Sequence, residues 1–478
     1  MSAAHRPTLA VFCVAAVTAC GSGSGSATPA LPADHQLQEV AALTDVNPDP
    51  NIVEVNLVAQ VSTTQYLDGK TAQIWAYRDG SLPNSKAAIP GPMLRTEVGN
   101  EVIVHFRNEL PDETTVHWHG IRLPPESDGT PSSQAPVLPG SEFEYRFTTR
   151  DASSFWYHPH VRAYDQVERG LYAPLVVTGG VQPDVAADRY LVLDDVKLDS
   201  NGTLNEQTTG LDRMLGRQGN VLLINGRHAP AELRVAAGSR ERWRFVNAAN
   251  GRYFNLRVPG AQLLVIGSDG GLVPEPYASD ALLIAPGERY DVLVTFDGSE
   301  GGSAVLQTMH YDRGHDIPDP GPQDLLKVAY GPSIETPRAL PETWGETPAL
   351  PIVSDTPVRP FVLEEYEPPG LPVLFTINGE QWPDSRPVYV KQGSVEIWDV
   401  QNKAEMDHPF HLHGMFFEVL SSGENPQPIG GWKDTVNIPQ TSSVRLAVRY
   451  EPAGMWMFHC HILEHADLGM MGMLMVEP

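Results

Sequence analysis

Short runs of alternating apolar and polar residues recur along the chain and predict β-strands. One such run precedes each of three asparagines that follow a glycine by nine residues, at Asn108, Asn247 and Asn402. These first strands are expected at 101–106, 241–245 and 394–398, with second strands at 143–147, 290–296 and 444–450 and third strands at 155–160, 304–309 and 455–461. The spacing indicates one β-rich unit that is present three times.

A chain of 478 residues is long enough for about three domains of roughly 150 residues each. The repeat places these domains near 46–180, 181–345 and 346–478, and regular short strands with glycine and proline turns predict that each is a β-sandwich. The proline-rich stretch 311–372 is expected to be a long connection between the second and third domains.

Histidines distinguish the three copies. Four His-x-His pairs occur in the first and third copies, at 117/119, 158/160, 411/413 and 459/461. At the equivalent offsets the second copy has Leu256 and Val258, then Gln307 and Met309. Random placement of 16 histidines predicts about 0.5 such pairs, so chance is a poor explanation. The second domain is therefore predicted to be a spacer between two metal-bearing units.

On a strand, residues i and i+2 point to the same face, so each pair can direct two imidazoles at neighbouring metal ions. Imidazole binds Cu, Zn, Fe or Ni. Cys460 lies between His459 and His461 and should point to the opposite face. Together with His408, His465 and Met470 it offers two imidazoles, one thiolate and one thioether, the ligand set of a blue-copper site. Zinc fits a thioether poorly, and an iron–sulfur cluster needs more cysteines.

The motifs resemble those of three-domain multicopper oxidases, of the bacterial laccase and copper-resistance oxidase kind. They stand at 117–120 (HWHG), 156–160 (WYHPH), 408–414 (HPFHLHG) and 459–465 (HCHILEH) with Met470, and the likeness extends to 266–274 and 432–436. The resemblance covers nearly all of the chain after its first residues. It implies three cupredoxin-like Greek-key β-sandwiches and four copper ions: one type 1 ion, one type 2 ion and a type 3 pair.

The resemblance also implies the ligands of each ion. The type 1 ligands would be His408, Cys460, His465 and Met470. The type 2 ion would be held by His117 and His411. One type 3 ion would be held by His119, His158 and His461, and the other by His160, His413 and His459.

Proton supply is a separate question. Asp128 matches an acidic residue that relays protons near the type 2 ion in the family, although an aspartate in a turn is also an ordinary structural residue. Several bacterial relatives have a second acid directly after the last type 1 histidine, where this chain has Ala466. Either Glu464 or Asp467 takes over that role, or the relay differs.

Charge and composition restrict the partners. The formal net charge is −26 at pH 7, which argues against nucleic acids and anionic membrane surfaces as partners. The expected partners are O2 and a small reducing substrate, and the chain is expected to be a monomer.

The N-terminal residues resemble a lipoprotein signal. Arg6 precedes a short apolar run, and small residues lead to Cys20. This predicts a signal peptide at 1–20, a flexible linker at 21–45, export to the periplasm or cell surface, and membrane contact only through a lipid on Cys20. An ordinary cleaved signal peptide is the alternative.

The predicted function is a laccase-like oxidase of phenols. The first alternative is an oxidase that converts Cu(I) to Cu(II), for which Glu405 and Met406, just before His408, could bind the substrate ion. Methionine-rich inserts of the kind that such relatives carry are not visible in the sequence. A copper-binding protein without catalysis, or a two-domain copper nitrite reductase, fits the retained ligand set less well.

Overall fold

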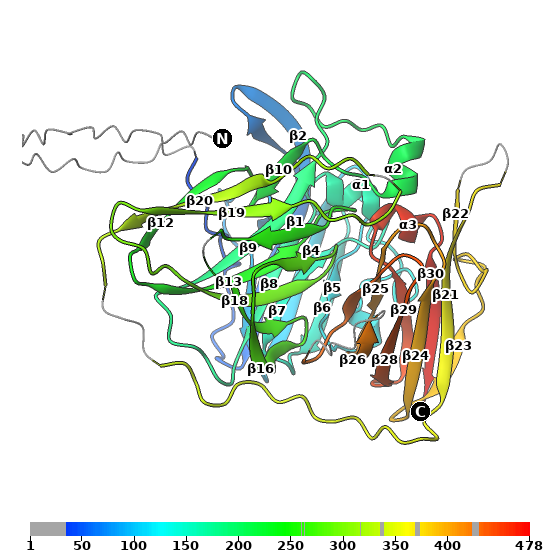
Figure 1. Cartoon of the computed structure of the whole chain (residues 1–478). Helices are drawn as coiled ribbons and strands as arrows, with labels where there is room; N and C mark the ends of the chain where they lie inside the picture. The colour runs from blue at the N-terminus through cyan, green and yellow to red at the C-terminus, as the bar shows by residue number, and fades with distance from the viewer. Residues whose placement is uncertain are drawn as a thin grey trace, which may run out of the picture.

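The computed structural model describes residues 35–478 except 260, 262, 316, 335–338, 369–372 and 423–429. The predicted signal peptide and the first part of the predicted linker lie outside these residues. Strands β1 to β30 account for most of the regular structure (Figure 1), so the predicted all-β class is confirmed. Each helix in the described part of the chain falls well short of the length and apolarity needed to cross a membrane.

The N-terminal sandwich comprises β1 to β8. Its sheets have the strand orders β2-β1-β4-β6 and β3-β8-β7-β5, and β1 pairs in parallel with β4. The strands are β1 (Ile52–Leu67), β2 (Lys70–Asp79), β3 (Leu94–Glu97), β4 (Glu101–Glu109), β5 (His117–His119), β6 (Glu142–Thr148), β7 (Ser153–His158) and β8 (Ala173–Thr178).

The middle sandwich comprises β9 to β20. Its sheets have the orders β11-β10-β9-β13-β18-β15-β16 and β12-β20-β19-β14-β17. The strands are β9 (Ala187–Val196), β10 (Val221–Ile224), β11 (Arg227–His228), β12 (Ala231–Ala236), β13 (Arg240–Asn247), β14 (Phe254–Arg257), β15 (Leu263–Ser268), β16 (Gly271–Ser279), β17 (Leu282–Ile284), β18 (Arg289–Thr295), β19 (Ser303–Met309) and β20 (Gln323–Gly331).

The C-terminal sandwich comprises β21 to β30. Its sheets have the orders β22-β21-β24-β28-β26 and β23-β30-β29-β25-β27. The strands are β21 (Val358–Tyr366), β22 (Leu374–Ile377), β23 (Val388–Lys391), β24 (Val395–Asn402), β25 (His408–Leu412), β26 (Phe417–Ser422), β27 (Thr435–Ile438), β28 (Ser443–Arg449), β29 (Gly454–Cys460) and β30 (Met471–Glu477).

The three sandwiches share one strand order. The sequence β2-β1-β4-β6 in the first corresponds to β10-β9-β13-β18 and to β22-β21-β24-β28 in the others. In each case the first strand of the unit pairs in parallel with the strand that has the repeated asparagine at or next to its end. The predicted first, second and third strands of the repeat correspond to β4, β13 and β24, to β6, β18 and β28, and to β7, β19 and β29.

The repeated asparagines fasten the turn that follows each of these strands. The Asn108 amide donates to the carbonyls of Asp112 and Val137, at 2.7 and 2.8 Å, and its side-chain oxygen accepts from the amide of Leu110. Asn247 and Asn402 make equivalent sets of bonds. A buried amide that satisfies three backbone groups fixes the path of the chain, which explains the constant spacing from asparagine to histidine.

Two strand predictions need correction. The stretch 311–372 contains all of β20 and β21, so the long connection between the two sandwiches is confined to residues between 332 and 357. The strand expected at 155–160 ends at His158, because Pro159 has no amide hydrogen to donate to a neighbouring strand. His160, His413 and His461 therefore lie just beyond strand ends rather than within strands.

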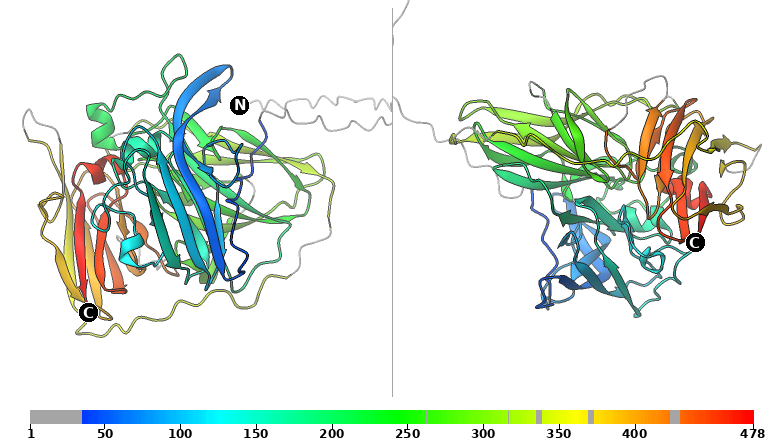
Figure 2. Two further views of the ribbon diagram at one scale, coloured as in Figure 1. Left: turned by 180° about the vertical axis from the view of Figure 1, so that it is seen from behind. Right: turned by 90° about the horizontal axis from the view of Figure 1, so that it is seen from below.

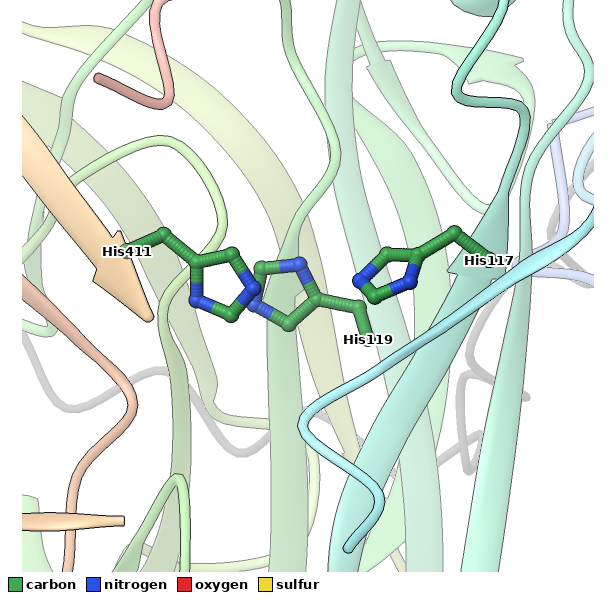
Figure 3. Close-up of side chains that lie close together, drawn as sticks. All are labelled: His117, His119 and His411. Carbon is green, nitrogen blue, oxygen red and sulfur yellow. The ribbon is translucent and has the colours of Figure 1, made fainter. Parts of the chain in front are cut away.

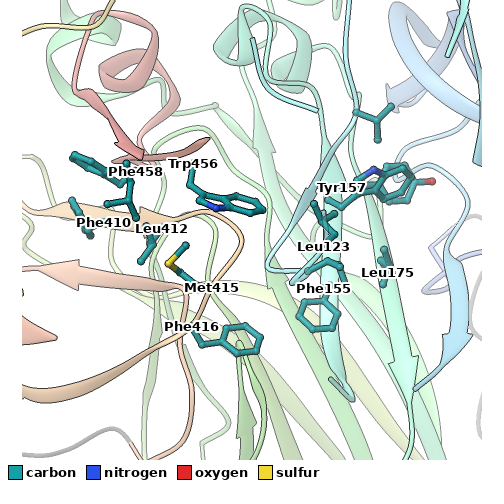
Figure 4. Close-up of a cluster of buried hydrophobic side chains, with 14 of the residues drawn as sticks. Leu123, Phe155, Tyr157, Leu175, Phe410, Leu412, Met415, Phe416, Trp456 and Phe458 are labelled. Atoms are coloured by element: carbon teal, nitrogen blue, oxygen red, sulfur yellow. The ribbon is translucent and has the colours of Figure 1, made fainter. Parts of the chain in front are cut away.

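Apolar packing joins the first and third sandwiches. One buried cluster contains residues of both, including Phe155 and Tyr157 on β7 and Phe410 and Phe458 on β25 and β29 (Figure 4). The middle sandwich has a separate core, in which Leu256 and Val258 occupy the positions of the histidines in the other copies. Figure 2 shows the three sandwiches arranged so that each borders the other two.

Short helices gather where the sandwiches meet. They are α1 (Ala163–Glu168), α2 (Gly210–Leu215) and α3 (Leu463–Asp467), and a 3-10 turn covers Pro125–Ser127. Helix α3 contacts both α1 and α2 (Figure 1), so one helix from each sandwich contributes to this junction.

Candidate metal centre

Strand register brings the histidine pairs together within each sandwich. His117 on β5 is directly opposite His158 on β7, and His411 on β25 is directly opposite His459 on β29. The remaining partners follow two residues later in the chain. Each sandwich thus offers four imidazoles at the ends of two neighbouring strands.

The two sets of four face each other and are buried. Ligand atoms within 4.8 Å of one another define three groups of histidines: 119/158/461, 160/413/459 and 117/119/411. His119 and His411 stack at 3.8 Å between ring centroids, with His117 beside them (Figure 3). His160, the most exposed of the eight, is only 7% exposed. Each group combines residues from the first and third sandwiches, as the repeat predicts.

The outward ring nitrogens are held by protein oxygens. Four histidines donate Nδ1–H to a backbone carbonyl: His117 to Asp128 at 2.7 Å, His158 to Pro159 at 2.9 Å, His411 to Asp434 at 2.9 Å and His459 to Cys460 at 2.8 Å. A proton fixed on Nδ1 leaves Nε2 with a free lone pair, which is the form of imidazole that binds a metal ion.

The inward ring nitrogens have no such partners. In the described part of the chain, Nε2 of His117, His158 and His411 and both ring nitrogens of His461 lack a hydrogen bond. Nε2 of His413 lies 3.0 Å from Nε2 of His459, although both rings carry their proton on Nδ1, so two lone pairs face each other. Burial lowers the pKa of His158, His413 and His459 well below the ordinary value. These rings therefore stay neutral, and protonation does not satisfy their free nitrogens. Bound cations would satisfy these nitrogens, so the residues fit a metal cluster.

A second cluster surrounds Cys460. Its Sγ lies 3.5 Å from Nδ1 of His408 and 3.8 Å from Nδ1 of His465, and the two nitrogens are 3.2 Å apart. Nε2 of His465 donates to the carbonyl of Met214 at 3.0 Å, which leaves Nδ1 free. Met470 is fully buried, and its carbonyl accepts from the amide of Cys460 at 3.0 Å. The ligand atoms of His408, Cys460 and His465 thus form a compact, buried group of the kind that holds a metal ion.

Burial raises the pKa of the Cys460 thiol well above the ordinary value in the absence of a cation. A bound metal ion reverses this preference, because it stabilises the thiolate directly. Cys460 is bonded through the backbone to His459 and His461, which belong to the histidine cluster. The two clusters are therefore joined directly through the peptide bonds on either side of Cys460.

Asp128 lies beside the histidine cluster and is 1% exposed. Its Oδ2 accepts from Nδ1 of His413 at 3.0 Å, and its Oδ1 lies 3.4 Å from Nδ1 of His117. Burial acts to raise the pKa of this carboxyl, but His413 and His117 outweigh burial and lower it below the ordinary value. A carboxylate, rather than a carboxylic acid, thus faces the two imidazoles.

Sequence reasoning missed a group of buried charges that supports the cluster from the other side. Asp434 and Thr435 lie next to His119: Nε2 of His119 is 3.2 Å from Oδ1 of Asp434 and 3.1 Å from Oγ1 of Thr435. Arg289 of the middle sandwich donates to both carboxylate oxygens of Asp434, at 2.7 and 2.6 Å. Asp269, also of the middle sandwich, accepts from the Arg289 amide at 2.8 Å.

These side chains are at most 1% exposed. Asp269 further accepts from Lys433 at 3.1 Å and from the amides of Asp434 and Thr435. The middle sandwich is therefore more than a spacer, because its charged side chains position a loop that holds two cluster histidines. The signal was present in the sequence: the stretches 266–274 and 432–436 contain Asp269 and Asp434.

The two candidate acids Glu464 and Asp467 are bonded to residues outside the histidine cluster. Glu464 is buried and accepts from the Asn250 amide at 2.9 Å, and Asp467 accepts from the backbone of Tyr164 at 3.1 Å. Burial raises the pKa of Glu464 to about 7. Glu405 is exposed, whereas Met406 is buried in the core, so these two do not form a joint surface site.

Family comparisons agree with this geometry. Three models of multicopper oxidase domains match the chain, at residues 59–181, 188–314 and 355–478. The chain belongs to the multicopper oxidase family. It is 31% identical to multicopper oxidase MmcO of Mycobacterium tuberculosis over 433 residues, which cover 80% of each chain. It is 27% identical to the laccase of Bacillus subtilis, covering 84% of this chain and 89% of that one.

Solved structures give the same result. This multicopper oxidase superposes on the Campylobacter jejuni multicopper oxidase, described as a metallo-oxidase, with a TM-score of 0.82 and 30% identity, covering 94% and 96% of the two chains. It superposes on the laccase of Pediococcus acidilactici with a TM-score of 0.81 and 31% identity, covering 94% and 95%. The chain is thus a copper-dependent oxidoreductase that uses O2 and a reducing substrate, with cupredoxin-like sandwiches.

Proposed function

We propose that this multicopper oxidase holds four copper ions and couples one-electron oxidation of a phenol, or a similar donor, to reduction of O2 to water. The observation that carries this proposal is the pair of buried clusters that Cys460 joins to His459 and His461. Four electrons are needed to reduce O2 completely, and four one-electron sites match that number. When bound, the copper ions supply the one-electron chemistry that the side chains lack.

Each copper ion is assigned a ligand set. His408, Cys460, His465 and Met470 would hold the type 1 ion, and His117 and His411 the type 2 ion. His119, His158 and His461 would hold one type 3 ion, and His160, His413 and His459 the other. Proximity of the ligand atoms within these groups, and the unpartnered nitrogens of several members, support the assignment.

The polypeptide contributes positioning, insulation and a short path between the clusters. Backbone carbonyls fix the tautomers of the histidines, so that little rearrangement accompanies a change of charge. Burial of both clusters excludes bulk water. We assign Asp128 the role of proton relay, since its carboxylate contacts two cluster histidines.

Cu(I) oxidation is the second candidate. The Campylobacter jejuni relative is described as a metallo-oxidase, and the protein is strongly acidic. The burial of Met406 weakens this candidate, because a thioether in the core cannot meet an ion at the surface.

O2 uptake by the copper-loaded protein separates the two candidates. Uptake is measured with Cu(I) and with 2,6-dimethoxyphenol under the same conditions, with and without added Cu(II). Fast phenol turnover without added copper supports the laccase-like function. Phenol turnover that requires added copper, together with fast Cu(I) oxidation, supports the metallo-oxidase. Absence of uptake from a fully loaded protein contradicts both.

For the whole chain we propose domains at 46–180, 181–345 and 346–478, a monomeric state, and export with a lipid on Cys20. The residues before Cys20 and the glycine–serine run after it support the lipid anchor. Metabolic labelling with a palmitate analogue tests it. The wild-type protein should take up label and Cys20→Ser should not, and equal labelling of both would contradict the proposal.

A further inference from the structure

A cavity of about 320 Å³ lies in the middle sandwich, lined by residues from 218–222, 252–253 and 308–323. Two features of its lining stand out. Tyr253 and Tyr311 stack with ring centroids 5.6 Å apart, and Arg252 and Arg313 bring guanidinium groups to the wall. Among the described lining residues there is no aspartate or glutamate, although the protein carries a net charge of −26.

The cavity adjoins the cysteine cluster. The carbonyl of Arg313 accepts from the amide of Asp407, the residue before His408, at 2.8 Å. The Tyr311 hydroxyl donates to the Asp407 carboxylate at 2.6 Å. On the other side, the Arg313 guanidinium donates to the carbonyl of Leu215. The neighbouring carbonyl, of Met214, accepts from His465.

Arg313 has unused hydrogen-bonding capacity. The residue is 2% exposed, and its Nη1 has no partner among the described residues. Arg252, by contrast, is paired with Asp195 at 2.5 Å. A buried guanidinium nitrogen without an acceptor is costly, because its lost hydration is not replaced. The Arg313 guanidinium also lies 5.5 Å from the centroid of the Tyr253 ring, so the free nitrogen and the aromatic surface are next to each other.

We propose that this cavity is a binding site for an aromatic donor that carries a carboxylate, such as a hydroxybenzoate. The proposal rests on the proposed laccase-like function and specifies its substrate class. The carboxylate would accept hydrogen bonds from Arg313, and the ring would pack beside Tyr253 and Tyr311. Each phenol would lose one electron to the copper ion that His408, Cys460 and His465 would hold, and one proton to solvent, giving a phenoxyl radical. Four such steps supply the four electrons for O2, with four protons taken up to form two water molecules.

The same lining disfavours Cu(I) at this position. A cation that enters the cavity meets the positive charge of Arg313, whose Nη1 has no partner among the described residues, and finds no carboxylate among the described lining residues. Repulsion from a buried guanidinium is screened poorly by salt. The cavity thus discriminates by charge as well as by shape.

Binding to the unaltered, copper-loaded protein is the first test, and it needs no turnover. The probes are 3,5-dimethoxybenzoate, which lacks the oxidisable hydroxyl, and its neutral isostere 3,5-dimethoxybenzamide, with affinities measured by calorimetry. The benzoate is expected to bind at least about tenfold more tightly, consistent with one charge-assisted pair. Equal affinities, or no binding of either probe, would overturn the proposal.

Variants localise the effect. Arg313→Gln removes the positive charge, and Gln323→Glu adds a negative charge to the cavity wall. Each variant is expected to weaken benzoate binding about tenfold and to leave the affinity for the benzamide unchanged. Arg257→Gln, which removes an exposed charge of the same sheet, is the matched control and should change neither affinity. If Arg313→Gln does not fold, the proposal is still tested by Gln323→Glu and by the two probe affinities of the wild-type protein.

Turnover separates this proposal from the function on which it rests. The ratio of kcat/KM for 4-hydroxy-3,5-dimethoxybenzoate to that for 2,6-dimethoxyphenol should fall about tenfold in Arg313→Gln. An unchanged ratio in an enzyme that oxidises both phenols would refute the carboxylate site and leave the oxidase function intact. Tight benzoate binding without O2 uptake from any phenol would refute the oxidase function, and with it the role of the site in catalysis.

Discussion

Both ring nitrogens of a histidine in this site have a role: one donates a hydrogen bond to the protein and the other is left free to bind metal. The nitrogen that faces away from the cluster donates to a carbonyl, as in His117 and His411, and that bond decides which nitrogen is free to bind metal. His465 is held in the opposite tautomer, since its Nε2 is the donor. The residue type gives the ligand, but a backbone carbonyl elsewhere in the fold gives its orientation.

Asp128→Asn tests the proposed proton relay. The amide keeps the shape of the side chain but removes the negative charge beside His413 and His117. The turnover number for O2 reduction is expected to fall about 100-fold, a typical effect of losing a positioned acid–base group. Stopped-flow absorbance measures the two half-reactions separately. Anaerobic bleaching of the blue band should be unchanged and reoxidation by O2 slowed; slowing of both steps would contradict the assignment.

Glu168 predicts a dependence of stability on pH. Burial raises its pKa to about 8, even though Arg217 lies 3.0 Å away. The pKa of Glu168 is higher in the folded protein than in the unfolded chain, so the protonated side chain stabilises the fold. This stabilisation is complete below about pH 4.5 and is lost as the pH rises towards 8. Across this window the free energy of unfolding of the wild-type protein should fall by up to about 1.4 kcal/mol per pH unit relative to that of Glu168→Gln. Urea unfolding at pH 5 and pH 8 measures the difference.

The matched control for this measurement is Glu206→Gln, which alters an acid whose side chain is 64% exposed. Its stability curve should run parallel to that of the wild type. If the Glu168→Gln curve is parallel as well, Glu168 is ionised throughout the window and the raised pKa is wrong.

At the scale of elements, the spacing from glycine to asparagine, together with the alternation of apolar and polar residues, was sufficient to find β4, β13 and β24 and the later strands of each copy. Alternation identifies a strand, but it cannot show where pairing stops. Pro159 and the turns after β25 and β29 end their strands inside the histidine motifs. The prolines of 311–372 predicted a long connection, but the stretch also contains the strands β20 and β21, so that prediction was wrong for these residues.

The turn after residues 125–127 offers a test of how tightly Asp128 is held. Gly129 and Gly140 both have φ of +76°, so an added side chain is equally strained at either position. A Cβ on Gly129 would lie 1.9 Å from the carbonyl oxygen of Val116, whereas none of the described atoms lies within 4 Å of one on Gly140. Gly140→Ala should cost about 1 kcal/mol of stability, and Gly129→Ala at least about 3 kcal/mol.

Thermal unfolding of the two alanine variants measures this difference. Because the backbone strain is shared, the gap between them reports the clash with Val116 alone. Equal melting temperatures would show that the loop around Asp128 can move, and that the geometry of the carboxylate is not fixed by its turn.

At the scale of the whole molecule, all three sandwiches take part in one site. The sequence was sufficient to identify the histidines of the first and third, because their ligand types and spacing are specific. The stretches 266–274 and 432–436 marked Asp269 and Asp434 in the sequence but not what these residues contact: Arg289 and Asp434 are 145 residues apart, and neither is a metal ligand. Only folding makes them a pair, so their role depends on contacts that no local pattern records.

Arg289→Lys tests this contribution. Lysine keeps the positive charge but cannot donate to both oxygens of Asp434, so the loop that holds His119 and His411 should shift. The hyperfine splitting of the type 2 copper signal in electron paramagnetic resonance is expected to change, and the blue absorption band to stay the same. Arg189→Lys, which breaks the two-bond contact with Glu241 within the middle sandwich, is the control and should alter neither signal.

The pairing of the first sandwich with the third also determines when the histidine cluster can form during synthesis of the chain. His160 and His459 meet across 299 residues of sequence, which a ribosome takes roughly 15–60 s to add at 5–20 residues per second. Throughout that interval the four early histidines have no counterparts, and the apolar face beneath them has nothing to cover it. An ion captured then would be held by half a ligand set. Metallation therefore belongs after synthesis, once the two distant parts of the chain have closed on each other.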